Sequence, residues 1–285
     1  MKVFSPAKLN LFLNVLSKRA DGYHELHTLF ERLSLGDDIT LKKRSSGILF
    51  GTDSRDIPRD ASNLVVRAAQ LLRKECAVNE GAEIFLKKRI PVAAGLGGGS
   101  SNAATVLLGL NRLWRLKLSR KKLLSLAAQL GSDVPFFVLE APFAIGEGRG
   151  EKLRPFRGFR RKLWHCLVKP PFGISTQEAY KGLVRGKLTP KKTNVRMLVR
   201  SVQTEDSGTL SNLLTNSLEL SLNKRVTAIS DIKKKLVFEG AFAALMSGSG
   251  STVFGLFSSE GKARRAAVKL RKKNRSWKVF VAATY

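Results

Sequence analysis

A glycine-rich run within residues 90–110 is the part of the chain best suited to hold an anion. It reads IPVAAGLGGGSSNAATVLLGL, with glycine at positions 95, 97, 98 and 99 ahead of an apolar helical segment. Glycine loses more backbone freedom on folding than any other residue, so such a cluster lowers stability. Bare backbone amides that lead into a helix N-terminus can converge on phosphate oxygens. Residues 95–101 therefore predict a phosphate loop; the alternative is a packing turn, for which one glycine would suffice.

Two common nucleotide-binding loops are excluded by the residues around this run. A Walker loop ends in Gly-Lys before Ser or Thr, and the chain has no lysine between Arg89 and Arg112. A dinucleotide fingerprint needs glycine where the chain has Ser100, and an acidic residue about 20 positions later, where it has Arg120 and other basic residues. No protein-kinase catalytic-loop signature or metal-binding signature is present.

Asp133 and Lys8 are candidates for the chemistry that would accompany a bound nucleoside triphosphate. Phosphoryl transfer uses a carboxylate to orient the acceptor hydroxyl, beside compensating cations. Asp133 lies between Gly131 and Pro135, which would hold it rigidly, although an aspartate there is more often a helix cap. Lys8 is on the more polar face of a strand-like segment, where lysines are usually solvated. Facing Asp133, it would instead keep the carboxylate ionised and neutralise the transferred group.

The elements that must position these residues alternate between strands and helices without a strict repeat. We expect strands at 8–19, 25–44, 83–89, 163–170 and 277–285. We expect helices after Asp60 or Ser62, after caps among Ser100, Ser101 and Asn102, over 119–130, 210–222 and 226–238, and once more before the terminal strand. In the first strand Lys8, Asn10 and Asn14 share a face. Residues 141–161 are rich in glycine, proline and charge. The pattern predicts an α+β fold of two subdomains, 1–153 and 154–285, with the boundary near Leu153.

The amino-acid composition is that of a globular protein with a large excess of basic residues. The 285 residues are 43% apolar with a net charge of +29, and residues 151–285 carry 28 basic and 8 acidic residues. Such a charge attracts nucleic acid, acidic membranes or phosphorylated small molecules. The basic clusters at 233–235 and 264–275 contain few aromatics, which favours solvated helix faces and makes nucleic acid an unexpected partner.

The cysteines and the hydropathy pattern argue against a disulfide-rich protein, a metal site and a membrane protein. Cys76 and Cys166 fit neither a disulfide framework nor a metal-ligand spacing. No segment of about 18 uncharged apolar residues occurs, and the N-terminus lacks a signal sequence. We expect no membrane association and a cytoplasmic protein.

Three segments, SPAKLNLFLNV, PVAAGLGGGSSNAA and MSGSGSTVFG, resemble the three signature motifs of the GHMP kinases. DGYHELHTLF, NLVVRAAQLL, GSDVPFFV and residues 216–219 are further similar to the 4-diphosphocytidyl-2-C-methyl-D-erythritol kinases of that superfamily. The likeness is close over residues 2–150 and returns at 212–255. It implies a two-subdomain GHMP kinase fold with the active site between subdomains. It also implies ATP-dependent phosphorylation of the 2-hydroxyl of 4-diphosphocytidyl-2-C-methyl-D-erythritol, with Mg²⁺, in non-mevalonate isoprenoid precursor synthesis.

The resemblance also implies roles for individual residues. Lys8 and Asp133 match the catalytic pair, and Asn10 matches the residue at the methylerythritol end. Tyr23, His24 and Tyr180 match the cytosine site. The ATP-binding positions are Asn63, Pro91, Gly95, Leu96, Gly97, Gly98, Gly99, Ser100 and Ser101. No acidic residue follows the loop, so ATP oxygens would hold the metal, with Ser100 or Ser101.

Some positions depart from the family pattern, and other functions stay open. Ala93 and Ala94 stand where relatives often have glycine, which is harmless if both keep φ below zero. Gln177 stands where some relatives have proline.

The nearest alternative function is that of another GHMP kinase, for homoserine or mevalonate, and the segment DGYHELHTLF separates the proposed kinase from these two. A basic nucleic-acid-binding protein with a structural glycine loop is the alternative from another class. The sequence leaves the oligomeric state open.

Overall fold

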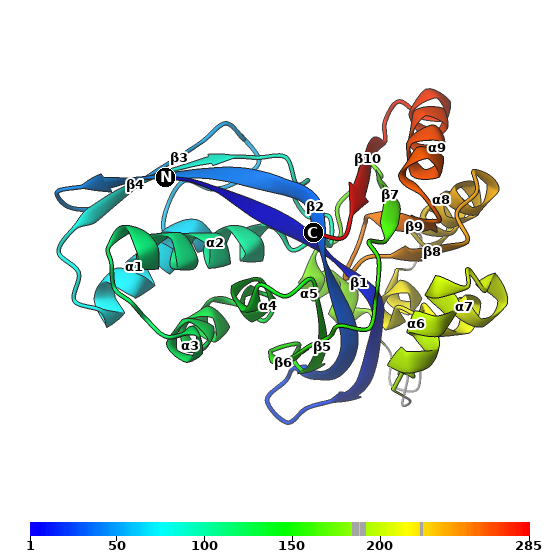
Figure 1. Cartoon of the computed structure of the whole chain (residues 1–285), viewed down its shortest axis with the longest axis horizontal. Helices are drawn as coiled ribbons and strands as arrows, with labels where there is room; N and C mark the ends of the chain where they lie inside the picture. Colours follow the sequence, from blue (N-terminus) through cyan, green and yellow to red (C-terminus); the bar gives the residue numbers. More distant parts are fainter. Residues whose placement is uncertain (184–187, 189–191, 223–224) are drawn as a thin grey trace. The chain divides into compact units, whose positions relative to one another are not determined.

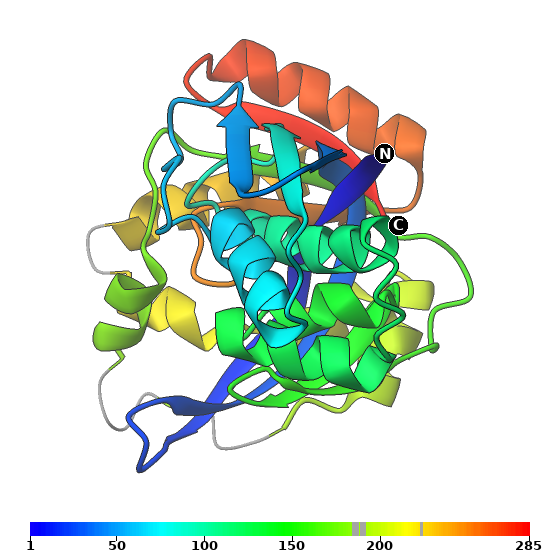
Figure 2. The same cartoon turned by 90° about the vertical axis from the view of Figure 1, so that its left-hand side faces the viewer.

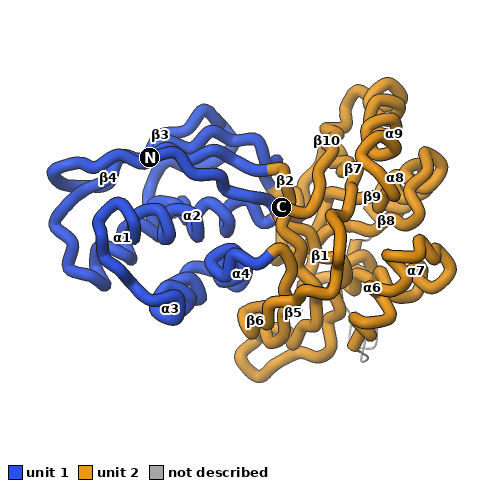
Figure 3. Tube along the Cα trace, in the orientation of Figure 1, with its two compact units in different colours: residues 1–7, 36–92, 97–141 blue, residues 8–35, 93–96, 142–285 orange. Residues whose placement is uncertain are grey.

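The chain folds into two compact units, each assembled from several separate segments. The structure is a computed structural model that describes residues 1–183, 188, 192–222 and 225–285. Unit 1 comprises residues 1–7, 36–92 and 97–141, and unit 2 comprises residues 8–35, 93–96 and 142–285 (Figure 3). Strands β1 (Lys2–Lys18) and β2 (His24–Arg44) contribute residues to both units. The mixture of helices and strands confirms the predicted α+β class.

Strand β1 is buried more completely than its alternating sequence predicts. Every residue from Ser5 to Val15 is buried, on both faces of the strand. The prediction of a half-exposed strand was wrong, because period-two alternation cannot reveal that the polar face is also covered. Lys8, Asn10 and Asn14 are therefore polar side chains in the interior, where each needs partners.

Unit 1 combines a small sheet with four helices. The end of β2 pairs antiparallel with β4 (Gly81–Lys87), which pairs in parallel with β3 (Ile48–Thr52). The helices contact one another and lie side by side in Figure 2; they are α1 (Leu64–Glu75), α2 (Gly98–Leu113), α3 (Arg120–Leu130) and α4 (Val134–Leu139).

The helix starts in unit 1 differ from the predicted caps in two cases. Asn63, rather than Asp60 or Ser62, caps α1, because its Oδ1 accepts from the Val65 N–H at 2.9 Å. Helix α2 begins after Gly97, earlier than the predicted serine and asparagine caps, and no side chain caps it. The third helix is as predicted, with Ser119 as N-cap and Gly131 as C-cap.

Unit 2 contains the strands that pair with the first half of β2 and a separate second sheet. The first half of β2 pairs antiparallel with β5 (Phe143–Gly148), which pairs with β6 (Lys152–Pro155). The second sheet is antiparallel in the order β10-β7-β9-β8, from β7 (Trp164–Lys169), β8 (Ala243–Met246), β9 (Val253–Phe257) and β10 (Lys278–Ala283).

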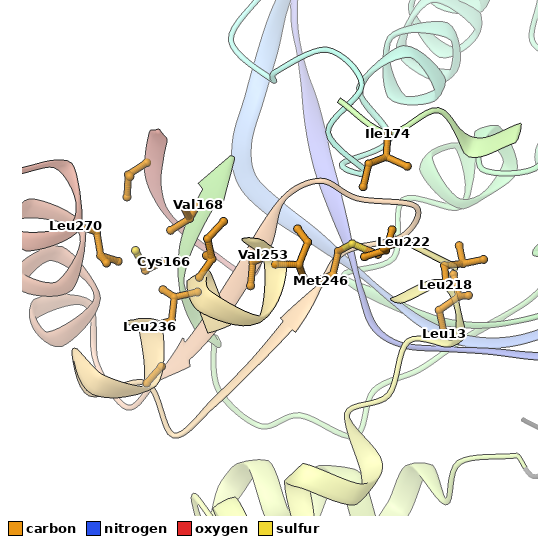
Figure 4. Packing of buried hydrophobic residues seen from close by; sticks show 14 of the residues in the cluster. Leu13, Cys166, Val168, Ile174, Leu218, Leu222, Leu236, Met246, Val253 and Leu270 are labelled. Atoms are coloured by element: carbon orange, nitrogen blue, oxygen red, sulfur yellow. The ribbon is translucent and has the colours of Figure 1, made fainter. Parts of the chain in front are cut away.

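Helices α8 (Val226–Phe238) and α9 (Glu260–Lys273) pack on this second sheet. Leu236 of α8 and Leu270 of α9 join one apolar cluster with Cys166 and Val253 of the sheet (Figure 4). Burial raises the pKa of the Cys166 thiol to about 12, so this cysteine is a packing residue. Both helices thus present their opposite sides to solvent.

The segment before α8 is more broken than predicted. It forms α5 (Thr176–Lys181), α6 (Val195–Gln203), α7 (Ser207–Leu213) and the 3₁₀ helix η1 (Ser217–Ser221). The predicted single helix over 210–222 is wrong, because Asn216 is extended and divides it. Helix α6 was not predicted, although its Val195, Leu198, Val199 and Val202 have the i, i+3, i+4, i+7 spacing of an amphipathic helix. Throughout the described ranges, no helix has both the length and the apolar character to cross a membrane.

Candidate functional site

Lys8 in unit 2 is a buried lysine with defined neighbours. It is 4% exposed, and its Nζ donates to Asn10 Oδ1 at 2.6 Å and lies 5.4 Å from the Phe30 ring centroid. Its backbone N–H donates to Leu96 O at 3.0 Å, which joins β1 to the residue before Gly97. A buried ammonium persists only with compensating partners. The alternative of a merely solvated lysine is therefore wrong.

Asn10 lies on β1 beside Lys8, as the strand period predicts. Its Nδ2 donates to Thr28 Oγ1 at 2.8 Å, and that hydroxyl donates to the Phe12 carbonyl at 2.6 Å. This chain of hydrogen bonds fixes which way the amide points, so its oxygen faces the Lys8 ammonium. The proposed contact of Asn10 with substrate stays a prediction.

Two glycine loops of the chain contact each other in unit 2. We call residues 93–99 the first glycine loop and residues 247–251 the second. A Cβ atom on Gly95 would lie 2.1 Å from the Ser247 carbonyl oxygen, and Gly95 has φ +73°, so no other residue fits there. Ser247 Oγ donates to Gly95 O at 3.0 Å, and the Thr252 N–H donates to Ala94 O at 3.2 Å.

The second glycine loop also borders the polar pair on β1. A Cβ atom on Gly248 would lie 3.2 Å from Asn10 Oδ1 and 3.3 Å from Lys8 Nζ. The backbone of this loop therefore forms part of the surroundings of the Lys8 ammonium. The sequence analysis treated the second loop only as a family motif and missed this contact.

Asn216 and Glu219 hold the second glycine loop in place. Asn216 Nδ2 donates to Met246 O at 2.9 Å and to Gly248 O at 2.7 Å. Glu219 Oε1 accepts from the Met246 N–H at 2.9 Å, and Lys233 Nζ lies 2.8 Å from Glu219 Oε2. The sequence analysis assigned neither residue a role. Their signal was two polar residues with i, i+3 spacing at the break in an expected helix.

The first glycine loop contains a residue in an unexpected backbone conformation. Ala93 has φ +50°, in the left-handed region, whereas Ala94 does not have a positive φ. The condition under which alanine would be harmless, a negative φ at both positions, is therefore not met at Ala93. A Cβ atom makes this conformation unfavourable for alanine.

The start of α2 in unit 1 has the form expected of an anion site. Gly97 caps the helix with φ +66°, and no side chain occupies the cap. A 16-residue helix with uncapped first amides attracts negative charge. A Cβ atom on Gly98 would lie 3.1 Å from Lys88 Nζ, so an ammonium group lies beside this helix start. The search for a lysine within the loop missed Lys88, which precedes it.

A buried carboxylate organises the residues around this helix start. Asp37, with a fully buried side chain, accepts from Lys88 Nζ at 2.6 Å and Asn102 Nδ2 at 2.8 Å through one oxygen. Its other oxygen accepts from the Arg89 and Ile90 N–H groups at 2.7 and 2.8 Å. Asp37 thus fixes both the approach to the first glycine loop and the helix that follows it.

Ser101 and Ser100 lie differently with respect to solvent. Ser101 is fully buried, and its hydroxyl is 2.8 Å from that of Ser5. Ser100, one position earlier, is partly exposed. Of the two hydroxyls suggested as metal ligands, only that of Ser100 remains suitable. No three His, Cys, Asp or Glu side chains gather as a metal site within the part of the chain that the structure describes.

Asp133 lies at the N-terminal end of α4, also in unit 1. The Val134 N–H donates to Gly131 O at 3.2 Å, and Pro135 opens the helix, so the connection is tight as predicted. The Asp133 side chain makes no capping hydrogen bond. The helix-cap alternative is therefore wrong, and the catalytic role stays a prediction.

Two more of the predicted ATP-binding residues, Asn63 and Pro91, are also in unit 1. Asn63, 8% exposed, uses its oxygen to cap α1 and its Nδ2 to donate to Pro58 O at 2.7 Å. Pro91 is partly exposed at the end of the segment that Asp37 anchors. A contact of either residue with a nucleotide stays a prediction.

One ring pair and one cation–π contact in unit 2 contain the predicted cytosine-site residues. His24 and Tyr180 stack, with ring centroids 5.2 Å apart and planes inclined by 28°. Burial, reinforced by Lys18, lowers the pKa of His24, which favours a neutral ring. Tyr23 is 52% exposed, and the Arg149 guanidinium lies 4.7 Å from its ring centroid. The prediction had not included Arg149.

Comparison with known proteins identifies the family. Residues 63–141 match the GHMP kinases N terminal domain and residues 198–276 match the GHMP kinases C terminal domain. These matches lie on either side of Leu153, and the boundary there stays a prediction.

Individual relatives are similar over nearly the whole chain. A 4-diphosphocytidyl-2-C-methyl-D-erythritol kinase of Pelotomaculum thermopropionicum is 44% identical, covering 93% of this chain and 92% of the relative. That of Syntrophotalea carbinolica is 43% identical, covering 97% and 96%.

Solved structures agree with this likeness. A crystal structure of 4-(cytidine 5'-diphospho)-2C-methyl-D-erythritol kinase has a TM-score of 0.84 at 34% identity, covering 99% of this chain and 98% of that one. Mevalonate kinase from Methanococcus jannaschii, with a TM-score of 0.72 at 15% identity, shares the fold. The chain belongs to the 4-diphosphocytidyl-2-C-methyl-D-erythritol kinase family of the GHMP kinases.

Proposed function

We propose that the protein transfers the γ-phosphoryl group of ATP to the 2-hydroxyl of 4-diphosphocytidyl-2-C-methyl-D-erythritol, in non-mevalonate isoprenoid precursor synthesis. The observation that carries this proposal is a buried Lys8 ammonium between Asn10 and the second glycine loop, in a chain whose relatives at 43–44% identity bear that kinase name. Because the cosubstrate ATP is made in the cytoplasm, we place the reaction there.

The roles follow from the chemistry of each group. Asp133, whose carboxylate does not cap its helix, would accept the proton of the acceptor hydroxyl or orient it. Lys8 would offset charge on the transferred group. The uncapped amides of α2 and the Lys88 ammonium would hold ATP phosphates. Lys8 would therefore supply the cation that a Walker loop carries within its own sequence.

The cytidine end is proposed to bind at the exposed ring of Tyr23 and at the partly buried rings of His24 and Tyr180. Tyr23, with Arg149 near its ring, offers a stacking surface, and His24 with Tyr180 offers a second. Stacking of a base on such a ring contributes about 1 to 3 kcal/mol. A nucleotide-linked acceptor fits these rings better than homoserine or mevalonate, which have no base to stack.

Magnesium fits this proposal as a companion of ATP. It would bridge phosphate oxygens and neutralise their charge. The described residues provide no carboxylate cluster for it, so the protein's contribution would be limited to the Ser100 hydroxyl, with ATP supplying most oxygens.

Turnover of Asp133→Asn tests the proposal. With ATP, Mg²⁺ and 4-diphosphocytidyl-2-C-methyl-D-erythritol, we expect kcat to fall about a hundredfold or more while ATP affinity and thermal stability are preserved. Asp231→Asn, on an exposed face of α8, is the matched control and should be fully active. Near-normal turnover by Asp133→Asn would reject the catalytic role. A wild-type protein that phosphorylates homoserine or mevalonate instead would reject the substrate.

A further inference from the structure

The strongest unexplained feature of the molecule is the charge of its last 60 residues. Residues 226–285 contain twelve basic and three acidic residues. None of the residues proposed for ATP or substrate lies on α8 or α9. The proposed kinase reaction therefore does not account for this concentration of positive charge.

The cations of α9 form a row on its solvent side. Ala263, Ala266, Ala267 and Leu270 of this helix are buried against the sheet. Lys262, Arg265, Lys269 and Lys272 are exposed and follow one another at spacings of three and four residues, so they share one face. Over ten residues of helix this row is about 15 Å long. We call these four residues the cationic row.

Glu239 does not cancel this charge. Lys269 Nζ lies 3.0 Å from one of its oxygens and Lys273 Nζ lies 2.7 Å from the other. The Glu239 side chain is only 2% exposed, so one enclosed carboxylate serves two lysines. This pairing also holds α9 to the end of α8, next to Phe238.

Two aromatic side chains from other segments lie beside Lys273 and Lys235, two further cations of α9 and α8 that are not part of the cationic row. Phe238, at the end of α8, is 80% exposed, and Lys273 Nζ lies 4.9 Å from its ring centroid. Trp277, after α9, is partly exposed, and Lys235 Nζ lies 5.1 Å from its ring. The sequence argued against nucleic acid because the basic clusters lack interleaved aromatics. Folding supplies those aromatics from outside the clusters.

We propose that the α8–α9 face, formed by the cationic row with Phe238 and Trp277, binds single-stranded RNA. The row would follow the phosphate backbone, and unpaired bases would stack on the exposed rings. An anionic membrane fits less well, because the apolar residues of α9 already face the sheet and leave only Val268 exposed on the helix. A duplex fits less well, because its bases are not free to stack.

Fluorescence anisotropy with a labelled twenty-nucleotide oligouridylate tests the proposal. We expect salt-sensitive binding, with a log–log slope of about −2.8 for four phosphate contacts. The triple variant Lys262→Glu, Arg265→Glu, Lys272→Glu should bind at least about tenfold more weakly, with a slope smaller by about 2. Kinase turnover should not change, which separates this test from that of the proposed reaction.

Two further variants make the test specific. Arg160→Glu, Arg196→Glu, Arg200→Glu changes the charge equally at exposed sites of unit 2 outside the α8–α9 face, and should weaken binding less than threefold. Phe238→Leu keeps an apolar side chain without a ring, and should weaken binding about tenfold with an unchanged slope.

Several results would overturn the proposal. Equal losses in the two triple variants would mean diffuse attraction without a site. Unchanged binding by Phe238→Leu, or tighter binding of a duplex of the same length, would reject stacking. Binding to phosphatidylglycerol vesicles without binding to the oligonucleotide would assign the face to membranes instead.

Discussion

The two glycine loops are held by different chemistry. In unit 1, to which residues 97–99 of the first loop belong, the buried Asp37 carboxylate accepts from one ammonium, one amide and two backbone N–H groups. The second loop, in unit 2, is held mainly by the neutral amide of Asn216, which donates to two backbone carbonyls. Asp37 is thus a charged group that accepts hydrogen bonds, whereas Asn216 is a neutral group that donates hydrogen bonds to the loop.

This difference matches the neighbours of each loop. The Asp37 carboxylate neutralises Lys88, which would otherwise be a buried ammonium without a counter-ion near Gly98. The second loop borders the Lys8 ammonium, and Asn216 anchors it without bringing a second full charge there. We infer that the first loop depends on charge balance and that the second depends on amide orientation.

Asp37→Asn should break the first anchor and give the largest loss of stability. It leaves the Lys88 ammonium, whose side chain is 9% exposed, without its partner and turns an amide N–H toward other donors. Removing one partner of a buried pair lowers the free energy of unfolding by about 3 to 5 kcal/mol. Urea denaturation measures this. Asp38→Asn, next in sequence, removes a carboxylate paired with Arg89 at the surface and should change stability by about 0 to 1 kcal/mol. Similar losses in both variants would contradict a buried anchor.

Asn216→Asp should break the second anchor, because it replaces the donating amide nitrogen with a carboxylate oxygen that can only accept. The substituted oxygen would face Met246 O and Gly248 O, which now accept hydrogen bonds. Leaving buried acceptors unpaired lowers stability by about 1 to 3 kcal/mol. Because Gly248 borders Lys8, kcat should fall more than ATP affinity if the proposed reaction is correct.

The control for this variant is the same substitution at a site that uses only the amide oxygen. Asn274 accepts from Ser276 through Oδ1, so Asn274→Asp should change stability by less than about 0.5 kcal/mol. If Asn216→Asp lowers stability and leaves kcat unchanged, the anchor is structural and does not position the Lys8 surroundings.

The sequence predicted local features of the site better than its contacts. Strand β1, the glycine-to-helix transition at α2 and the tight turn at Asp133 were recognisable, because glycine, proline and period-two alternation act within a few residues. The anchors were not recognisable. Asp37 lies 65 positions from Asn102, and Asn216 lies 32 from Gly248. A lone buried carboxylate or amide has no periodicity that would reveal its distant partners.

Backbone conformation was the other feature that the sequence did not reveal. Alanine in the first glycine loop would be harmless only at negative φ, yet Ala93 has φ +50°. Single-residue identity does not set φ when a loop is fixed at both ends by other contacts, as this one is by Thr252 on Ala94 and Ser247 on Gly95. The rings beside Lys235 and Lys273 could not be predicted for a related reason, since Trp277 and Phe238 come from separate segments of the chain.

Ala93→Gly tests the comparison of the two glycine loops through the smallest expected change in the free energy of unfolding. The second loop has glycine at both left-handed positions, Gly248 and Gly250, whereas the first has alanine at one of its three. Relieving the Cβ strain at Ala93 should raise the free energy of unfolding by about 1 kcal/mol, less the entropy that glycine gains in the unfolded chain. Ala94→Gly, at a buried position without positive φ, should lower it by about 0.5 to 1 kcal/mol. Opposite signs in the two neighbouring variants, measured by thermal denaturation, would locate the strain at residue 93. A loss in both would mean that the Ala93 side chain stabilises the loop by more than its backbone strain, so that the two loops differ in composition and not in strain.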